Sequence, residues 1–140
     1  KALKRPARAV SLDEMWTYAG ARRGRSRNIQ WIWTAVIEWD DGTRAVDFEV
    51  GDRSEETLIQ LCDHLPLAEG YYSDGYEAYT WLPRNRHHVG KGGKVNRNEG
   101  LHSMLRDRLH RLRRRTKGYT KSVAMLSASI AMICVRSGWT

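Results

Sequence analysis

The stretch IQWIWTAVIEWDDGTRAVDFEV, residues 29–50, decides the fold of this chain. Its first half, residues 29–39, is rich in tryptophan and β-branched residues, which favour strands. Asp40-Asp41-Gly42 follows, and an Asp-Gly pair between two apolar runs is a strong hairpin signal. Residues 43–50 then form the returning strand. The stretch therefore predicts an antiparallel hairpin.

Strand and helix signals continue on both sides of this hairpin. Residues 9–18 mix apolar and polar side chains as a strand does, so three antiparallel strands are expected in a row. Gly51 breaks the pattern, and Ser54 can cap a helix whose leucines recur at helical spacing as far as Pro66. Further on we expect strands at 70–73 and 87–91, a turn and short helix at 75–82, and helices at 95–116 and 121–135. The helix at 95–116 has one apolar stripe, formed by Leu101, Leu105, Leu109 and Leu112.

This order of elements predicts an α/β protein with a ribonuclease H-like fold, in which helices flank a mixed five-stranded sheet and long basic helices end the chain. The length of 140 residues and the hydrophobic content of 41% fit one compact domain with a core. In such a fold the first strand is central and lies beside the strand that precedes Asp74. Asp13 and Asp74 are therefore expected to meet across neighbouring strands.

Positive charge is concentrated at the two ends of the chain. The net charge is +8 and the isoelectric point is about 9.9, which favours a polyanionic partner, above all nucleic acid. Between residues 28 and 83 the chain is acidic, and basic segments precede and follow it. The alternative is a solvated surface with a chance skew. The basic residues expected to contact DNA are Arg22, Arg23, Arg25, Lys91, Lys94, Arg97, Arg113, Arg114, Arg115, Lys117 and Lys121.

Membrane insertion, secretion and a cysteine-based site are all disfavoured. The longest apolar stretch, residues 123–135, is shorter than the roughly 20 residues that span a bilayer, so we expect a buried helix there. The first residues lack the apolar core of a signal peptide, and a cytoplasmic, nucleoid-associated location is expected. Cys62 and Cys134 are far apart in sequence, so we expect reduced core cysteines rather than a zinc site or a disulfide.

Asp13, Asp74 and Glu99 are the candidate metal ligands. Carboxylate oxygens bind Mg²⁺ or Mn²⁺, and two such ions can cut a phosphodiester by activating the attacking oxygen and stabilising the leaving oxygen. Glu99 and Arg106 are seven residues apart in the expected helix, so they lie near the same face, away from the leucine stripe. That face can hold both metal and phosphate, which makes these four residues the candidate catalytic set.

Each acid also has a simpler interpretation. Asp13 can be an ordinary exposed strand residue with Glu14 as the real ligand, Asp74 a turn residue, and Glu99 part of a solvated helix face. Asp47 and Asp52 compete as ligands. Asp52 precedes a helix and is expected to be a turn or cap residue, and Asp47 to face solvent.

Histidines and tryptophans near the expected site are weaker candidates. His87 and His88 lie close to it in the expected fold and can touch phosphate or assist catalysis, although histidines are common in basic loops. Tryptophans are more often core or sheet residues than base-stacking platforms, and this is what we expect of Trp16, Trp31, Trp33 and Trp39.

Five phrases in a fixed order resemble the catalytic domain of DDE transposases of the insertion-sequence-one family. They are LDEMW (12–16), GDRS (51–54), SDGYEAY (73–79), NRNEGLH (96–102) and LRDRL (105–109), the last continuing to TKS (120–122). The resemblance covers nearly the whole chain. It implies an RNase H-like domain that uses magnesium to nick transposon-end DNA and joins the freed 3′-hydroxyl to target DNA.

The resemblance also assigns roles and partners. Asp13 and Asp74 would be direct metal ligands, Glu99 would complete the site, and Arg106 would contact a phosphate or steady the glutamate. Residues 1–10 would be a basic segment and 11–140 the catalytic domain, without the family's N-terminal DNA-recognition region, so a fragment or a separate end-recognition subunit is expected. Joining two ends to one target implies a homodimer or higher oligomer. The competing functions are a stand-alone nuclease of this fold and a non-catalytic DNA-binding module.

Overall fold

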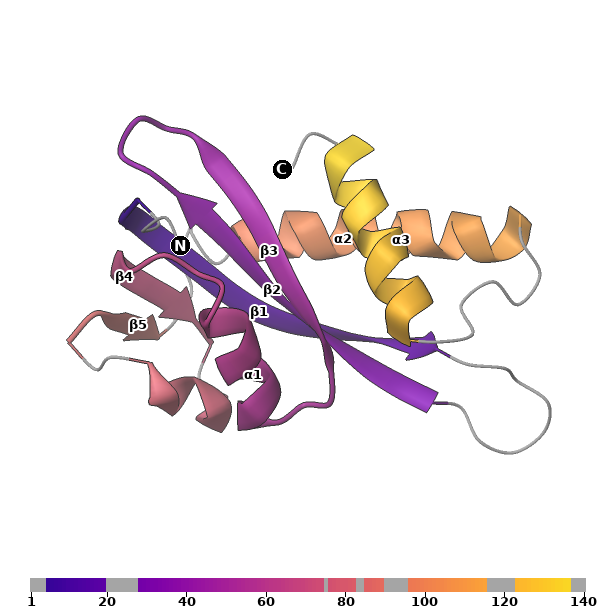
Figure 1. The fold of residues 1–140 in the computed structure, drawn as a ribbon, viewed down its shortest axis with the longest axis horizontal. Coiled ribbons are helices and arrows are strands. Elements are labelled where there is room, and N and C mark those ends of the chain that lie inside the picture. Colours follow the sequence, from indigo (N-terminus) through magenta and orange to yellow (C-terminus); the bar gives the residue numbers. More distant parts are fainter. Residues whose placement is uncertain are drawn as a thin grey trace.

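The computed structural model describes residues 5–19, 28–74, 76–82, 85–89, 96–115 and 123–136. Within these residues, one sheet is surrounded by helices (Figure 1). The strands are β1 (Ala7–Ala19), β2 (Asn28–Glu38), β3 (Arg44–Gly51), β4 (Ala68–Ser73) and β5 (His87–Val89). The helices are α1 (Glu55–Cys62), α2 (Asn96–Arg115), α3 (Val123–Arg136) and the 3-10 helix η1 (Glu77–Trp81).

The sheet is mixed, with the strand order β3-β2-β1-β4-β5. The first three strands are antiparallel, whereas β4 lies parallel to β1 and to β5. The central position of the first strand is therefore confirmed. The expected hairpin is also present, because Gly42 adopts a φ of +83° and its N–H donates to the Trp39 carbonyl.

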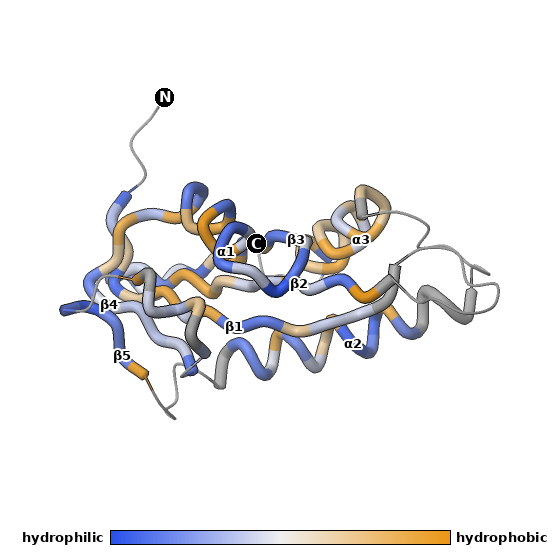
Figure 2. The backbone as a smooth tube through the Cα atoms, turned by 90° about the horizontal axis from the view of Figure 1, so that it is seen from below, coloured by the Kyte–Doolittle hydropathy of each residue, from blue (hydrophilic) through white to orange (hydrophobic). Residues whose placement is uncertain are grey.

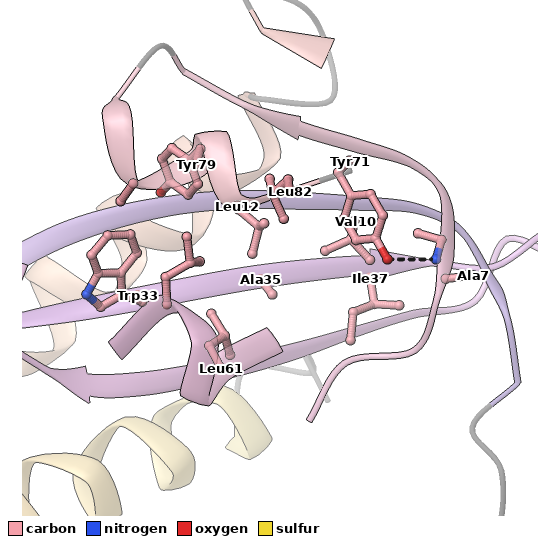
Figure 3. Packing of buried hydrophobic residues seen from close by; sticks show 13 residues of the cluster. Ala7, Val10, Leu12, Trp33, Ala35, Ile37, Leu61, Tyr71, Tyr79 and Leu82 are labelled. Atoms are coloured by element: carbon pink, nitrogen blue, oxygen red, sulfur yellow. Dashed lines mark hydrogen bonds between the residues drawn. The ribbon is translucent and has the colours of Figure 1, made fainter. Parts of the chain in front are cut away.

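Two faces of the sheet bury different sets of side chains. One face carries Val10, Leu12, Trp33 and Ile37, which pack against Leu58 and Leu61 of α1 and against Tyr79 of η1. Figure 3 shows Tyr79 close to Trp33 at one end of this cluster. Ser54 caps α1 as expected, but the helix ends at Cys62 rather than near Pro66, because the following residues leave it through turns.

The other face is covered by α2, which lies on the opposite side of the strands from α1 (Figure 2). Leu101, Leu105 and Leu109 are buried against this face, as the stripe predicted; the Leu112 side chain lies outside the described residues. α3 crosses α2 and contacts β3 (Figure 1). None of the described helices is long and apolar enough to cross a membrane.

Two predictions about buried residues need correction. α3 buries only one side, through Leu126, Ile130 and Cys134, and exposes Met125, Met132 and Val135, so it is not a fully buried helix. Trp33 is a core residue, and Trp31 and Trp39 pack partly buried against its cluster. Trp16 is half exposed, because it lies beyond Ser11, where β1 no longer pairs with β4.

The end of β4 creates an open edge on the central strand. β1 pairs with β4 only from Ala7 to Ser11, although β1 continues to Ala19. Beyond Ser11, β1 pairs with β2 alone among the described strands. Asp13 and Glu14 come just after this point, and Asp74 follows the last residue of β4. The topology thus brings all three acids to one edge.

Candidate active site

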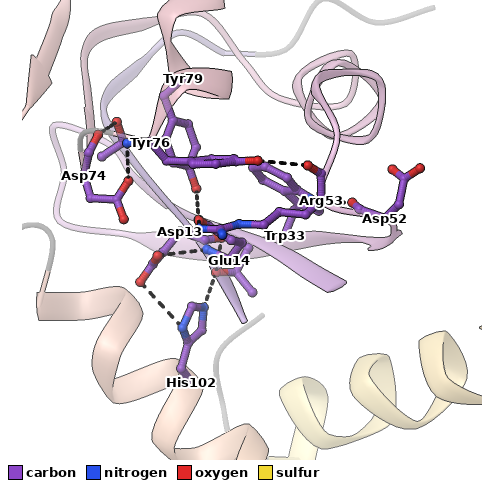
Figure 4. A network of polar contacts seen from close by, with 11 residues as sticks. Asp13, Glu14, Trp33, Asp52, Arg53, Asp74, Tyr76, Tyr79 and His102 are labelled. Atoms are coloured by element: carbon purple, nitrogen blue, oxygen red, sulfur yellow. Dashed lines mark hydrogen bonds and ion pairs between the residues drawn. The ribbon is translucent and has the colours of Figure 1, made fainter. Parts of the chain in front are cut away.

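Three carboxylates gather at this edge. Asp13, Glu14 and Asp74 each contribute an oxygen, and these oxygens lie within 4.8 Å of one another (Figure 4). Asp13 and Asp74 are 61 positions apart in sequence, so only the parallel pairing of β1 and β4 brings them together. Their expected meeting across neighbouring strands is confirmed.

Asp13 lies in a partly buried, negatively charged environment. Its Oδ1 accepts the Glu14 backbone N–H at 2.9 Å, and its Oδ2 lies 3.6 Å from Nδ1 of His102. Burial raises the pKa of Asp13 to about 6, and the charges of Glu14, Asp74 and Glu99 act in the same direction, against the backbone hydrogen bond. Asp13 is therefore not an ordinary exposed strand residue.

Glu14 points to the other side of β1 and is already engaged. Its carboxylate is almost fully buried, with Oε1 2.9 Å from a guanidinium nitrogen of Arg53 and Oε2 accepting the Tyr79 hydroxyl at 2.6 Å. The ion pair compensates the Glu14 charge in a site from which water is largely excluded. Among the described residues, Glu14 is the acid of the cluster with an ion pair to an arginine, so the contact geometry favours Asp13 and Asp74 over Glu14 as metal ligands.

Arg53 is fixed beside the acids by aromatic rings. Its guanidinium carbon lies 3.9 Å from the ring centroid of Tyr76 and 4.7 Å from that of Trp31. The Tyr76 hydroxyl also donates to the Arg53 carbonyl at 3.0 Å. The side chain remains 41% exposed, so it can still meet a ligand. Sequence reasoning assigned Arg53 no role, since its contacts come from three separate segments.

Asp74 is both a turn residue and a member of the cluster. Its Oδ1 accepts the Tyr76 backbone N–H at 2.9 Å, which is the local turn that the simpler interpretation expected. The same exposed carboxylate lies against Asp13 and Glu14. The turn orients the side chain toward the cluster, so the two interpretations are compatible.

Glu99 and Arg106 flank His102 on α2. Both are exposed, and Glu99 is close enough for its charge to raise the pKa of Asp13. Glu99 is not part of the set of oxygens within 4.8 Å that the described residues form. Burial lowers the pKa of His102 to about 4, and the charge of Arg106 adds to this. Glu99 thus lies near Asp13, and a site role for Arg106 stays a prediction.

The two histidines of β5 have local partners. His87 Nε2 contacts the Ser73 hydroxyl, and burial lowers the pKa of His87, with His88 adding to the effect. His88 stacks on Tyr72, with 4.9 Å between ring centroids. These contacts place both rings beside the end of β4, and a role in phosphate binding or catalysis stays a prediction.

The competing carboxylates are elsewhere. Asp52 accepts hydrogen bonds from the hydroxyls of Ser54 and Thr57 just before α1, which fits the expected turn residue, whereas the helix cap itself is Ser54. Asp47 is about one-third exposed, and its carboxylate accepts the Phe48 backbone N–H at 2.8 Å. Neither belongs to the carboxylate cluster.

The side chains of all eleven residues expected to contact DNA lie outside the described residues. The side chains of Arg97, Arg113, Arg114 and Arg115 lie outside the described residues, although the α2 backbone at these positions is described. The remaining ones, also outside, are Arg22, Arg23, Arg25, Lys91, Lys94, Lys117 and Lys121. Their contact with DNA stays a prediction.

Comparison with known proteins gives one family. A family model described as IS1 transposase matches residues 8–136, which includes every strand and helix described above almost completely. A search of curated proteins returns no match. The matched region contains the five phrases that resemble this family, and two of them supply the acids of the carboxylate edge. The chain belongs to the IS1 transposase family.

Proposed function

We propose that this chain is an RNase H-like DDE catalytic domain that cleaves transposon-end DNA and transfers the 3′-hydroxyl end into target DNA. Family membership implies a transposase with DNA as partner and a divalent metal as cofactor. The observation that carries the finer proposal is the pair Asp13 and Asp74 at the open edge of β1. Central β1 and its parallel neighbour β4 also support an RNase H-like arrangement.

The donor set fits a hard divalent cation. All three groups in the cluster are carboxylates, which suit Mg²⁺ or Mn²⁺ better than zinc or copper. Burial raises the pKa of Asp13 and the charges of Glu14, Asp74 and Glu99 add to this, so a bound cation would offset the negative charge there. Asp13 and Asp74 would hold the metal, Glu99 would complete the site, and we propose that two ions bind.

The proposed reaction has two steps, and each is a nucleophilic displacement at phosphorus. In the first, a water oxygen bonds to the scissile phosphorus as the bond to the 3′ oxygen breaks, and the released oxygen takes up a proton to become the 3′-hydroxyl. In the second, this hydroxyl loses its proton and bonds to a target phosphorus, and a target 3′ oxygen leaves. The bound metal supplies activation of the attacking oxygen and stabilisation of the leaving one.

The chain's own residues position the substrate in this proposal. Asp13 and Asp74 fix where the scissile phosphate sits, and Arg106 contacts a phosphate or steadies Glu99. Arg53 presents an exposed guanidinium next to the acids and is suited to a neighbouring phosphate. We further propose a basic N-terminal segment before one catalytic domain that begins near β1, and a homodimer or higher oligomer, because two ends join one target.

A strand-transfer assay tests the proposal. A pre-cleaved labelled DNA end is incubated with plasmid and the wild-type chain, with magnesium or with chelator. Joined product is expected only with magnesium, and Asp74→Asn should abolish it while DNA binding persists. Asp47→Asn is the matched control, because this strand carboxylate also accepts the N–H of the next residue but lies outside the cluster.

The outcomes separate the competing functions. Cleavage without joining would favour a nuclease. DNA binding with neither reaction, even when a separate end-recognition partner is added, would favour a non-catalytic module. Loss of joining in Asp47→Asn to the same extent as in Asp74→Asn would contradict the assigned site.

A further inference from the structure

A series of buried polar side chains connects α2 to the carboxylate cluster. Apolar packing does not explain it. Asn98 and Thr34 are fully buried and His102 is 3% exposed. The Thr34 hydroxyl lies 2.6 Å from His102 Nε2 and 2.8 Å from Asn98 Oδ1. His102 then faces Asp13 through its other ring nitrogen (Figure 4). Buried polar groups are costly, so a connected set of three calls for a functional explanation.

The single hydrogen of the Thr34 hydroxyl limits how these side chains can be bonded. The Thr34 hydroxyl has one hydrogen, but His102 Nε2, Asn98 Oδ1 and the Asp13 carbonyl all lie within 3.2 Å of its oxygen. Meanwhile Asn98 Nδ2 is buried without a hydrogen-bond partner. Turning the Asn98 amide by half a turn lets its N–H donate to Thr34, and the hydroxyl hydrogen is then available to His102 Nε2 or to the Asp13 carbonyl. The unpaired atom becomes a carbonyl oxygen, which proteins tolerate better than an unpaired N–H.

A hydrogen on His102 Nδ1 suits both neighbours of the ring, because Nδ1 faces the Asp13 carboxylate and Nε2 can then accept from the Thr34 hydroxyl. In a neutral ring whose Nε2 accepts a hydrogen bond, the ring hydrogen must be on Nδ1. A protonated ring would carry the same Nδ1–H, so this donor points toward Asp13 in both charge states. The separation from Asp13 Oδ2 is 3.6 Å, longer than the roughly 3.2 Å of a good hydrogen bond, but an N–H dipole still attracts a carboxylate at this distance.

We propose that His102 is a positioning residue for Asp13, and that Thr34 and Asn98 fix its imidazole so that Nδ1–H orients the carboxylate for a divalent metal. The Glu14 N–H holds Asp13 Oδ1 and His102 faces Oδ2, so the two donors together define the plane of the carboxylate. Loss of a residue that hydrogen-bonds to a metal ligand, without binding the metal itself, commonly lowers metal affinity by about 10- to 100-fold. The inference rests on the proposed function, because it needs Asp13 to bind metal.

Two substitutions at His102 distinguish the contribution of Nδ1 from that of Nε2. An Asn side chain places an amide N–H near the position of Nδ1, whereas the longer Gln places its amide near Nε2. Mn²⁺ affinity of the full chain is measured by calorimetric titration. We expect His102→Asn to stay within about threefold of the wild type and His102→Gln to lose about tenfold. Equal affinities in the two variants would overturn the positioning role.

A second pair tests the same series of side chains from Thr34. Thr34→Ser keeps the hydroxyl that fixes the imidazole, and Thr34→Val removes it with little change in shape. We expect Thr34→Ser to retain Mn²⁺ affinity and Thr34→Val to lose about as much as His102→Gln. Melting temperatures in chelator identify any variant that is unfolded. The proposal is then judged on the pair of variants, at His102 or at Thr34, in which both proteins are folded. Equal affinity within that pair would overturn the proposal.

Failure of the inference can be told apart from failure of the proposed function. Asp13→Asn and Asp74→Asn should each weaken Mn²⁺ binding strongly. If they do, but both variants of each pair bind alike, the metal site stands and only the positioning role is wrong. If Asp13→Asn and Asp74→Asn bind Mn²⁺ as the wild type does, the proposed metal site itself is wrong.

Discussion

Asp13→Asn should make the folded chain more stable while removing a proposed metal ligand. The Asp13 side chain is only 23% exposed and lies near Glu14, Asp74 and Glu99. An Asn side chain has nearly the same shape and can still accept the Glu14 backbone N–H. It carries no charge, so burial beside other carboxylates no longer opposes folding. Sites built for function often carry such a penalty in stability.

The size of the effect follows from the pKa. The pKa of Asp13 is raised from 3.8 to about 6, and the difference corresponds to about 3 kcal/mol. A group whose pKa is higher in the folded state stabilises that state fully below its unfolded pKa, and this contribution is lost as the pH rises through the folded pKa. The gain from Asp13→Asn should therefore be about 2 to 3 kcal/mol at pH 7.5, roughly half of that at pH 5, and small below pH 4.

Urea denaturation in chelator at pH 5 and pH 7.5 measures this gain. Melting temperatures give a second estimate, at roughly 4 °C per kcal/mol for a domain of this size. Added Mn²⁺ at about 100 times its dissociation constant should stabilise the wild type by about 2.7 kcal/mol and Asp13→Asn much less. The advantage of the variant should thus shrink or disappear when the metal is present.

Asp47→Asn is the control for this prediction. Asp47 accepts the same kind of backbone hydrogen bond but lies 3.9 Å from Nδ1 of His64 and outside the carboxylate cluster, so Asp47→Asn should bring no comparable gain. An Asp13→Asn variant that is no more stable than the wild type at pH 7.5, or whose advantage does not change with pH, would refute the reasoning about the site's charge.

Three further predictions concern other parts of the chain. Arg53→Ala should lower the free energy of unfolding by about 2 to 3 kcal/mol, because Glu14 then loses its cation; urea denaturation should show partial recovery when Glu14→Gln is added, and no recovery would argue against the ion pair. Ser54→Ala should cost about 1 kcal/mol in the same assay through loss of the α1 cap, and Ser54→Asp, which can still cap, should lose less. Replacing Arg113, Arg114 and Arg115 with Ala should flatten the salt dependence of DNA affinity by up to about three counterion units, and an unchanged slope would exclude their contact with phosphates.

Local patterns explain why the elements could be predicted. The hairpin at residues 28–51 combines β-branched strands with an Asp-Asp-Gly turn, and the leucines of α2 repeat at helical spacing. These signals act over a few residues and need no knowledge of distant contacts. They also bring Asp13 to the central strand and Asp74 to the end of its neighbour, which is enough to predict that the two meet.

The partners of the acids depend on contacts between distant segments. Glu14 is compensated by Arg53 and bonded to Tyr79, which are 39 and 65 positions away, and no local pattern predicts either contact. His102 was part of a recognised phrase, but its connection to Thr34 across 68 positions appears only when α2 packs on the sheet. The exposed sides of Trp16 and α3 likewise depend on where the sheet ends.

The sequence by itself determined the strands and helices, the basic and acidic regions, the family resemblance and the candidate acids. Only the tertiary structure decided which acid is compensated and which is not. The physical reason lies in strand geometry: Asp13 and Glu14 are adjacent, but successive side chains point to opposite faces of the sheet. One therefore meets His102 from α2, and the other meets Arg53 and Tyr79 on the opposite side.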